Sequence, residues 1–376
     1  MRDGLRHLAV FIAASMIGVQ AANAQGQKPQ VVTIAVAGPM TGKFKALGKQ
    51  MQVGAQMIVA DLNAKGGLNG RRIELITADD KCDAREAAAV ARRLVAKKIL
   101  FVAGHLCSRA SIPAAAIYAR AGIVMISPGS THPQLTDTAR RNGWRNVFRV
   151  CGRDDDQGRV IGRLLAEQFK DKPVAVLHDR TEYGRSLARV VTATVKKLGA
   201  RIALRKTYNP EAEDHSDLVE QLKKAKIEAV FLGAYHAEGA RIIRDAHKRD
   251  FKPQFVAGDA FVTEKFWQIA SKAGEGTLVT FQFDPRLKPA AKLVMERSKK
   301  AKKPLEFYGL YTYAAIEIWA AAAQRLRSFE AAQVSKALRQ GSYKTVIGDL
   351  SFNANGDVKT PQYVWYVWKD GKYKAK

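Results

Sequence analysis

Short apolar segments alternate with longer helical segments through most of the sequence, and this alternation most narrows the possible folds. The first four apolar segments have the composition of buried strands, and they are residues 31–37, 72–78, 99–103 and 122–126. Strands that alternate with helices predict βαβ units and a parallel sheet. Ligands bind such sheets beyond the carboxyl ends of the strands, so we expect a site formed by the loops 38–42, 104–108 and 127–131.

The same alternation begins again after an acidic segment at residues 152–158, with strands expected at 174–178, 202–208, 229–233 and 255–257. Residues 277–283 are expected to form a strand that returns to the first lobe, where helices 290–300 and 310–326 would pack. Residues 345–352 and 364–368 are expected to be late strands that cross back. The predicted fold class is α/β, with two similar doubly wound parallel-sheet lobes joined by a multi-strand hinge that lets them close on a ligand.

The N-terminus has the pattern of a secretory signal peptide. Arg2 and Arg6 precede an apolar run at residues 8–14, and Ala22-Asn23-Ala24 forms an A-x-A cleavage site, which predicts a signal peptide over residues 1–24. The apolar run is too short to span a bilayer, so we expect an exported, soluble chain; an uncleaved membrane anchor is the competing interpretation.

The remaining chain of about 350 residues exceeds one typical domain. We therefore expect an N-terminal lobe of residues 30–151 plus 283–352, and a C-terminal lobe of residues 152–282 plus 353–376.

The sequence contains three cysteines, which an exported chain can use for a disulfide. Cys82 and Cys107 lie 25 positions apart, and closing that loop would stabilise the fold by roughly 3 kcal/mol. We expect this pair to form, with Cys151 left as a buried, unreactive thiol. Three cysteines also allow other pairings.

The formal net charge of +27 raises the question of nucleic-acid binding. The basic residues are scattered along the expected helices, and no nucleic-acid motif accompanies them. We therefore expect no nucleic-acid partner; solubility, attraction to an anionic membrane surface or docking on an acidic partner explains the charge better.

The segment 101–111 contains a candidate anion site. Its strand ends at Gly104, and the helix that follows would direct free N–H groups and its dipole beyond the strand end, beside the hydroxyl of Ser108. Such a pocket could hold a small carboxylate without a cationic side chain. The alternative is an N-cap serine that satisfies only its own helix.

Motifs for enzymes, nucleotides and metals are missing from the sequence. There is no G-x-G-x-x-G after a strand, no P-loop, no G-x-S-x-G and no S-x-x-K. His178, His215 and His236 lack paired ligand spacing, so we expect structural roles for them. We expect a protein that is not an enzyme and that binds no cofactor and no metal.

Six segments, in order, resemble the periplasmic leucine/isoleucine/valine-binding proteins of bacterial ABC transporters, which are type I solute-binding proteins. They are residues 60–67 (ADLNAKGG), 79–83 (DDKCD), 104–108 (GHLCS), 154–158 (DDDQG), 178–184 (HDRTEYG) and 233–236 (GAYH). The resemblance covers nearly the whole mature chain, and it implies a monomeric periplasmic protein that delivers a free amino acid to a membrane permease.

The resemblance also implies the ligand contacts. Ser108 matches the family's carboxylate-binding serine, and Gly129, Ser130 and Thr131 match its second anchor. Thr131 would donate its N–H to the ligand carboxylate, while its hydroxyl and the Gly129 carbonyl face the ligand ammonium. The far lobe would supply Tyr183, Tyr235 and Asp259, of which Asp259 matches a family glutamate that pairs with the ammonium.

The sequence departs from the family pattern around the ligand side chain. Leu47 stands in place of a tyrosine, Arg153 replaces an apolar residue by the first hinge, and Tyr308 stands where a phenylalanine is expected. Leu47, Leu106 and Tyr308 are the expected side-chain pocket, and the expected ligand is a branched-chain aliphatic amino acid. An extracellular amino-acid sensor of the same fold is the alternative function.

Overall fold

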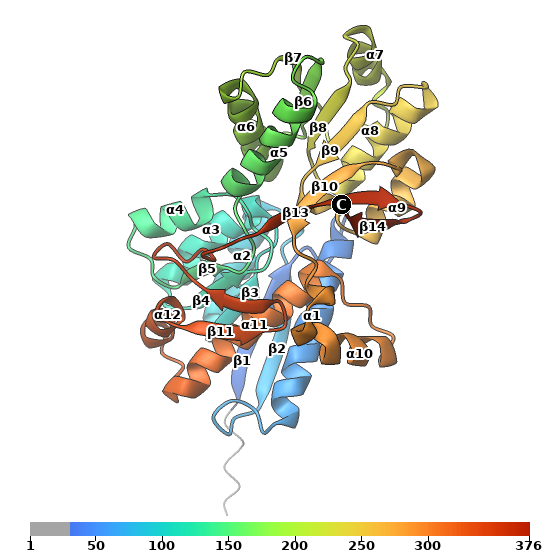
Figure 1. The fold of residues 1–376 in the computed structure, drawn as a ribbon. Coiled ribbons are helices and arrows are strands. Elements are labelled where there is room, and N and C mark those ends of the chain that lie inside the picture. Colours follow the sequence, from blue (N-terminus) through green and yellow to red (C-terminus); the bar gives the residue numbers. More distant parts are fainter. Residues whose placement is uncertain (1–30) are drawn as a thin grey trace, which may run out of the picture. The chain divides into compact units, whose positions relative to one another are not determined.

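A five-stranded parallel sheet organises the first part of the computed structural model, which describes residues 31–376. Its strand order is β2-β1-β3-β4-β5 (Figure 1). The strands are β1 (Val32–Gly38), β2 (Ile73–Asp79), β3 (Phe101–Gly104), β4 (Val124–Ser127) and β5 (Val147–Arg149). The expected signal peptide lies outside the described residues.

The register of this sheet brings the three expected loops together. Ala37 of β1 pairs with Gly104 of β3, and Ala103 of β3 pairs with Ile126 of β4. The carboxyl ends of β1, β3 and β4 therefore lie at one edge, and the loops that follow them start side by side.

Helices from both ends of the sequence pack around the first sheet. They are α1 (Lys45–Ala64), α2 (Ala84–Ala96), α3 (Ser108–Arg120), α4 (Gln134–Arg141), α11 (Phe307–Leu326) and α12 (Ala331–Gln340), while α10 (Lys292–Lys300) lies outside them and is joined to α1 by the Arg297–Asp61 ion pair. Trp319 of α11 is fully buried and stacks on Phe101 of β3, with 4.7 Å between ring centroids. Helices α1 and α11 cross at Gly54, where a Cβ atom would collide with the carbonyl oxygen of Gly309, so the crossing needs glycine.

A seven-stranded sheet organises the second part, with the order β14-β13-β10-β9-β8-β6-β7. Its strands are β6 (Val174–His178), β7 (Ile202–Thr207), β8 (Ala229–Gly233), β9 (Gln254–Ala257), β10 (Leu278–Gln282), β13 (Tyr363–Lys369) and β14 (Lys372–Ala375). Its helices are α5 (Asp154–Gln168), α6 (Glu182–Lys197), α7 (Ser216–Lys224), α8 (His236–Lys248) and α9 (Glu264–Ala270). Short 3₁₀ turns are η1 (Asp259–Phe261), η2 (Ser271–Gly274), η3 (Pro285–Leu287) and η4 (Pro289–Ala291). The α/β class with two lobes is thus confirmed.

Two expectations about late strands were wrong. The strand β10 does not return to the first lobe; it pairs parallel with β9 and antiparallel with β13, inside the second sheet. Residues 345–352 are not one strand but part of a separate hairpin of β11 (Ser342–Thr345) and β12 (Gly348–Ser351). Apolar composition predicts a buried strand in each case, but it carries no information on which sheet the strand joins.

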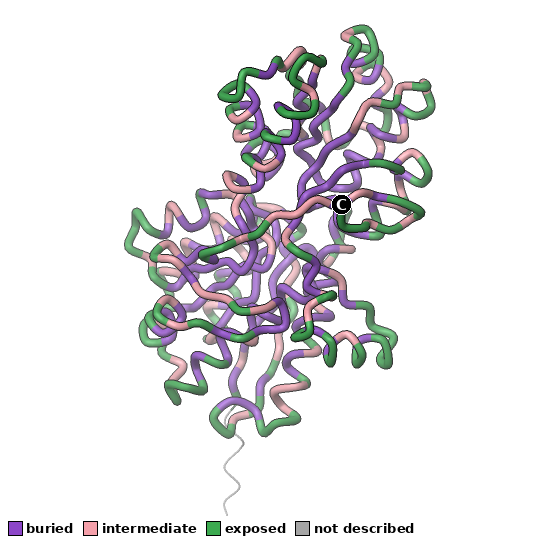
Figure 2. The backbone as a smooth tube through the Cα atoms, in the orientation of Figure 1, coloured by how far each residue is buried: buried purple, intermediate pink, exposed green. Residues whose placement is uncertain are grey.

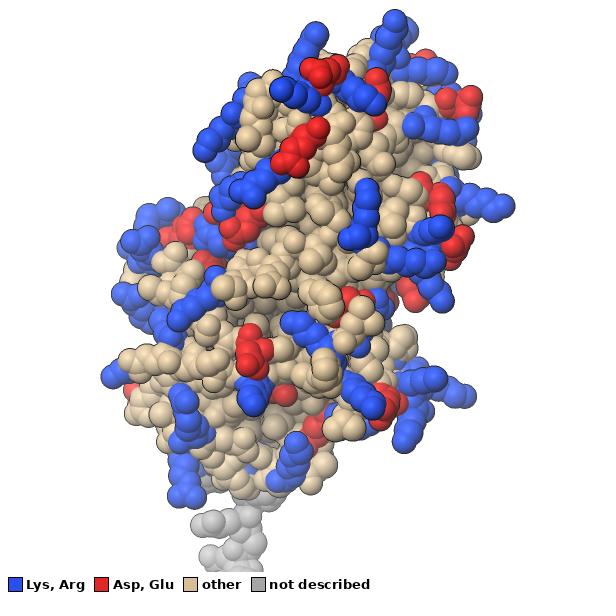
Figure 3. All heavy atoms as spheres, in the orientation of Figure 1, with Lys and Arg blue, Asp and Glu red and all other residues tan. Residues whose placement is uncertain are grey.

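The central strands of both sheets are buried, and most charged residues lie outside them. Figure 2 shows these central strands mainly in the buried colour, with exposed residues gathered on loops, edge strands and outer helix faces. On the face drawn in Figure 3, Lys and Arg side chains are spread widely with Asp and Glu between them, as the scattered sequence positions predict. None of the helices within residues 31–376 is long and apolar enough to cross a membrane.

Candidate functional site

Ser108 begins helix α3 at the edge of the first sheet. The N-cap position belongs to Cys107, and no side chain caps this helix, so the interpretation of Ser108 as an N-cap serine is wrong. The Ser108 side chain is buried, and its Oγ accepts a hydrogen bond from the amide of His132 (3.2 Å). Its own O–H proton stays available to a ligand, and the first N–H groups of α3 lie beside it.

The loop after β4 is folded by its serine hydroxyls. Ser127 Oγ accepts from the amides of Ser130 (2.9 Å) and Gly129 (3.3 Å) and donates to the carbonyl of His105 (2.6 Å). Ser130 Oγ donates to the carbonyl of Leu106 (2.8 Å) and also contacts the Ser111 hydroxyl. The Ser130 side chain therefore ties this loop to the Ser108 loop.

The backbone of the same loop has three groups without a hydrogen-bond partner among the described residues. Thr131 accepts a hydrogen bond at its carbonyl from the amide of Asp154 (2.9 Å). Within residues 31–376, the N–H of Thr131 and the carbonyls of Pro128 and Gly129 have no hydrogen-bond partner. Buried backbone groups are almost always paired, so unpartnered groups gathered in one loop are typical of a place where a ligand binds.

Asp259 provides the negative charge of the site. It lies in η1, is buried, and accepts hydrogen bonds from Tyr183 at Oδ1 (2.9 Å) and from Tyr308 at Oδ2 (2.8 Å). Burial raises the pKa of Asp259 above its ordinary value, and the two hydroxyls act in the opposite direction. Tyr183 belongs to α6 of the second lobe and Tyr308 to α11 of the first, so Asp259 is bonded to both lobes.

An aromatic wall continues from Asp259. The ring of Tyr183 packs on that of Tyr235 (centroids 5.2 Å apart), and Tyr235 packs on Phe44 (4.6 Å). Phe44 comes from the loop after β1, and sequence reasoning missed it. Its neighbour Lys43 also reaches the second lobe, through ion pairs with Glu211 (2.7 Å) and Glu238 (3.2 Å).

The expected side-chain pocket is assembled in part. A Cβ atom on Gly129 would lie 3.0 Å from Tyr308 Cε1 and 3.1 Å from Leu106 Cγ, so both side chains pack directly against the loop. The Tyr308 ring thus lies between Gly129 and Asp259. Leu47 is buried at the start of α1, and its place in the pocket stays a prediction.

Asp154 is a second buried carboxylate beside the site. The sequence places it only in the acidic segment between the lobes. Within the described residues neither of its side-chain oxygens has a hydrogen bond of good geometry. Burial raises the pKa of Asp154 to about 7; the nearby hydroxyls of Thr131 and Ser186 and the charge of Arg149 oppose the rise, and the charge of Asp259 adds to it. A buried, unpaired carboxylate is costly, which favours a functional role over a structural one.

The loops under Ser108 are cross-linked. The predicted Cys82–Cys107 disulfide is present, and Cys151 is free and buried. Asp80 and His105, both fully buried, join the same two loops through a hydrogen bond between Oδ2 and Nδ1 (2.6 Å). Burial raises the pKa of the Cys151 thiol to about 12, so this cysteine is unreactive.

The remaining histidines form no site of their own. Within residues 31–376 no three His, Cys, Asp or Glu side chains are grouped to hold a metal ion. His236 is fully buried in α8, where burial lowers its pKa to about 4, and His215 packs edge-on against Tyr208.

Comparison with known proteins identifies the family. Residues 31–372 match the family model described as periplasmic binding protein. The Leu/Ile/Val-binding protein homolog 1 of Brucella suis is 40% identical over 91% of this chain and 92% of its own. The leucine-, isoleucine-, valine-, threonine- and alanine-binding protein of Pseudomonas aeruginosa is 33% identical over 98% and 97%.

A solved structure gives the same result. The leucine-binding protein of Thermotoga maritima superposes with a TM-score of 0.84 at 25% identity, over 92% of this chain and 97% of that one. The family model covers nearly all of the described chain, and the two-lobed architecture and the sequence similarity agree with it. The protein therefore belongs to the periplasmic binding protein family.

Proposed function

We propose that this protein is the periplasmic solute-binding component of an ABC transporter and that it captures a free amino acid between its lobes. The observation that carries the proposal is the unpartnered N–H of Thr131 and carbonyl of Gly129, with the Tyr308 side chain packed on Gly129 and hydrogen-bonded to the carboxylate of Asp259. A donor, an acceptor and a carboxylate complement a zwitterion, whose carboxylate needs donors and whose ammonium needs acceptors.

Each pole of the ligand has its own set of groups. The ligand carboxylate would receive hydrogen bonds from the Ser108 hydroxyl and the Thr131 N–H, at the N-terminus of α3. The ligand ammonium would donate to the Gly129 carbonyl and to Asp259. Tyr183 and Tyr235 would close the site from the second lobe.

The ligand side chain is proposed to be branched and aliphatic. Leu106 and the ring of Tyr308 supply apolar surface against Gly129, and the relatives from Brucella and Pseudomonas are named for leucine, isoleucine and valine. Leu47 is proposed to complete this pocket.

Capture would proceed by closure of two lobes, residues 30–151 plus 283–352 and residues 152–282 plus 353–376. The contacts of Lys43 and Phe44 with the second lobe support a closed form that buries the ligand. We propose that residues 1–24 direct export and that the monomeric protein delivers its ligand to a membrane permease without changing it chemically and without binding nucleic acid.

A thermal-shift screen over the free amino acids tests the function. Leucine, isoleucine and valine are expected to raise the melting temperature in a concentration-dependent way, because ligands that bind only the folded state stabilise it by mass action. Glutamate and lysine, which place a charge against Leu106, serve as matched controls and are expected to cause no shift. A screen in which no amino acid raises the melting temperature contradicts the proposal; uptake by vesicles that contain the cognate permease distinguishes transport from sensing.

Leucine affinity is expected to rise with pH over about one pH unit on either side of 7, the value to which burial raises the pKa of Asp154. The buried Asp154 carboxylate lies beside Thr131, and we propose that its negative charge favours the ligand ammonium together with Asp259, whose pKa burial also raises. Protons must therefore leave when the ligand binds, and binding weakens on the acid side. Calorimetry across this pH range measures the effect; Asp154→Asn should flatten the profile near pH 7, and an unchanged profile in that variant contradicts the role of Asp154.

A further inference from the structure

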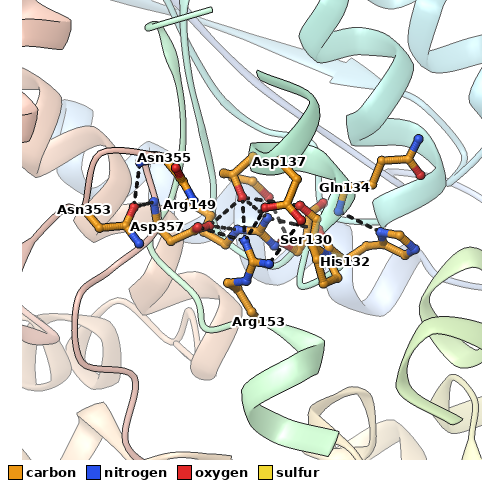
Figure 4. A network of polar contacts seen from close by, with 12 residues as sticks. Ser130, His132, Gln134, Asp137, Arg149, Arg153, Asn353, Asn355 and Asp357 are labelled. Carbon is orange, nitrogen blue, oxygen red and sulfur yellow. Dashed lines mark hydrogen bonds and ion pairs between the residues drawn. The ribbon is translucent and has the colours of Figure 1, made fainter. Parts of the chain in front are cut away.

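Arg149 lies behind the ligand-binding loop, at the end of β5, and is completely buried. Its Nη1 donates to the carbonyl of Ser130 (2.6 Å), and its Nη2 donates to the carbonyl of His132 (3.0 Å). Figure 4 shows this guanidinium pointing from β5 into the loop, with Arg153 beside it. The Arg149 side chain thus donates hydrogen bonds to the backbone on both sides of Thr131.

The hydrogen bond from Arg149 to the Ser130 carbonyl fixes the direction of the Thr131 N–H. The carbonyl of Ser130 and the N–H of Thr131 belong to one planar trans peptide, so they point in opposite directions. Because Arg149 holds the carbonyl, the N–H of Thr131 must point away from the arginine. The next peptide obeys the same rule: the Thr131 carbonyl faces the Asp154 amide, and the His132 amide faces Ser108 Oγ.

Arg149 is itself anchored by the last segment that connects the lobes. Its Nε forms an ion pair with Asp357 Oδ1 (2.7 Å), and its backbone amide donates to the Gly356 carbonyl (3.0 Å). Asp357 also receives Thr136 Oγ1 (2.7 Å) and pairs with Arg153 at Oδ2 (3.0 Å). The planar five-donor guanidinium can serve these acceptors at the same time, which a lysine ammonium cannot do.

We infer that Arg149 is a positioning residue, which aims the Thr131 N–H at the ligand carboxylate without touching the ligand. This inference rests on the proposed function and adds a residue to it that acts from behind the site. The inference makes a specific prediction. Loss of the hydrogen bonds from Arg149 to the loop should weaken binding of every amino acid by a similar factor, because the α-carboxylate is common to all of them.

Arg149→Lys tests the inference, because lysine keeps the buried positive charge beside Asp357 but cannot hold two carbonyls. We expect leucine and valine affinities to fall about 10- to 100-fold, as for the loss of a hydrogen bond to a charged group, with their ratio unchanged. Arg153→Lys is the matched control. Arg153 also pairs with Asp357 but donates to neither carbonyl of the loop, so its replacement should change affinity less than about threefold.

The chemical shift of the Thr131 amide proton distinguishes positioning from a purely structural role of Arg149, which would not change it. In ¹⁵N-threonine-labelled wild-type protein, leucine should shift this amide proton strongly downfield, and Thr131→Ser identifies the signal by its loss. In Arg149→Lys at saturating leucine the downfield shift should be much smaller, while in Arg153→Lys it should match the wild type.

Wild-type affinity in Arg149→Lys, or a full downfield shift, overturns the inference and leaves the proposed function standing. If the wild type itself binds no amino acid, the proposed function fails and the inference falls with it. If Arg149→Lys does not fold, Arg149→Met with Asp357→Asn removes both buried charges together and is measured in the same way.

Discussion

Replacing Ser108 and Asp259 together by alanine is expected to abolish amino-acid binding while the protein still folds. In the proposed function Ser108 binds the ligand carboxylate and Asp259 the ligand ammonium, so the double substitution removes a contact at each pole. Truncating one partner of a buried charge pair costs about 2–5 kcal/mol, so leucine affinity should fall by about 30- to 4,000-fold from Asp259 alone, and the loss of the Ser108 contact adds to this. Isothermal calorimetry with leucine measures the loss.

Folding should survive because the losses within the protein are offset. Asp259→Ala leaves the hydroxyls of Tyr183 and Tyr308 without an acceptor, but it also removes a buried carboxylate whose pKa burial raises. Ser108→Ala removes one acceptor at 3.2 Å from the His132 amide. We therefore expect circular dichroism like that of the wild type and an unliganded melting temperature within a few degrees of it.

A matched control replaces a buried serine and a buried aspartate outside the site. Ser335 lies on α12 and Asp245 at the end of α8 that is distant from Tyr235. Ser335→Ala with Asp245→Ala should bind leucine as the wild type does. Unchanged leucine affinity in the Ser108/Asp259 variant would reject the site assignment.

The sequence predicts which loops lie together because parallel strands end at a common edge. The alternation of apolar and helical segments predicted β1, β3 and β4, and their loops contain Ser108 and Thr131 at the edge where ligands bind. Sheet membership was less predictable. The strand β10 is as apolar as a strand of the first lobe would be, and only its pairing with β13, from the far end of the chain, places it in the second sheet.

The residues that sequence reasoning missed act through contacts between distant segments. Arg149 and Asp357 read as an isolated strand residue and a loop acid, and their ion pair exists only because the last segment crosses behind β5. Asp154 reads as part of an acidic run before a helix, and burial alone sets it apart from Asp155 and Asp156. The hydroxyl of Ser130 bonds to the carbonyl of Leu106, a contact between two loops that the sequence alone does not reveal.

Removing the disulfide by Cys82→Ala with Cys107→Ala is expected to lower the free energy of unfolding by about 3 kcal/mol. The cross-link closes a loop of sequence separation 25, and its loss frees that loop in the unfolded chain. Denaturation by urea, without ligand, measures the change. Cys151→Ala is the control for losing a buried sulfur without a cross-link, and it should cost about 1 kcal/mol.

Leucine affinity should change much less than stability in the same disulfide variant, by no more than about fivefold. The Asp80–His105 hydrogen bond joins the same two loops, and His105 also contacts the Tyr118 hydroxyl (3.1 Å), so the loop that carries Ser108 keeps a second brace. Adding His105→Ala to the disulfide variant removes that brace and should then weaken leucine binding sharply. If the disulfide variant alone lost affinity as strongly as the triple variant, the two braces would not be redundant, and the cystine itself would be what holds Ser108 in its binding geometry.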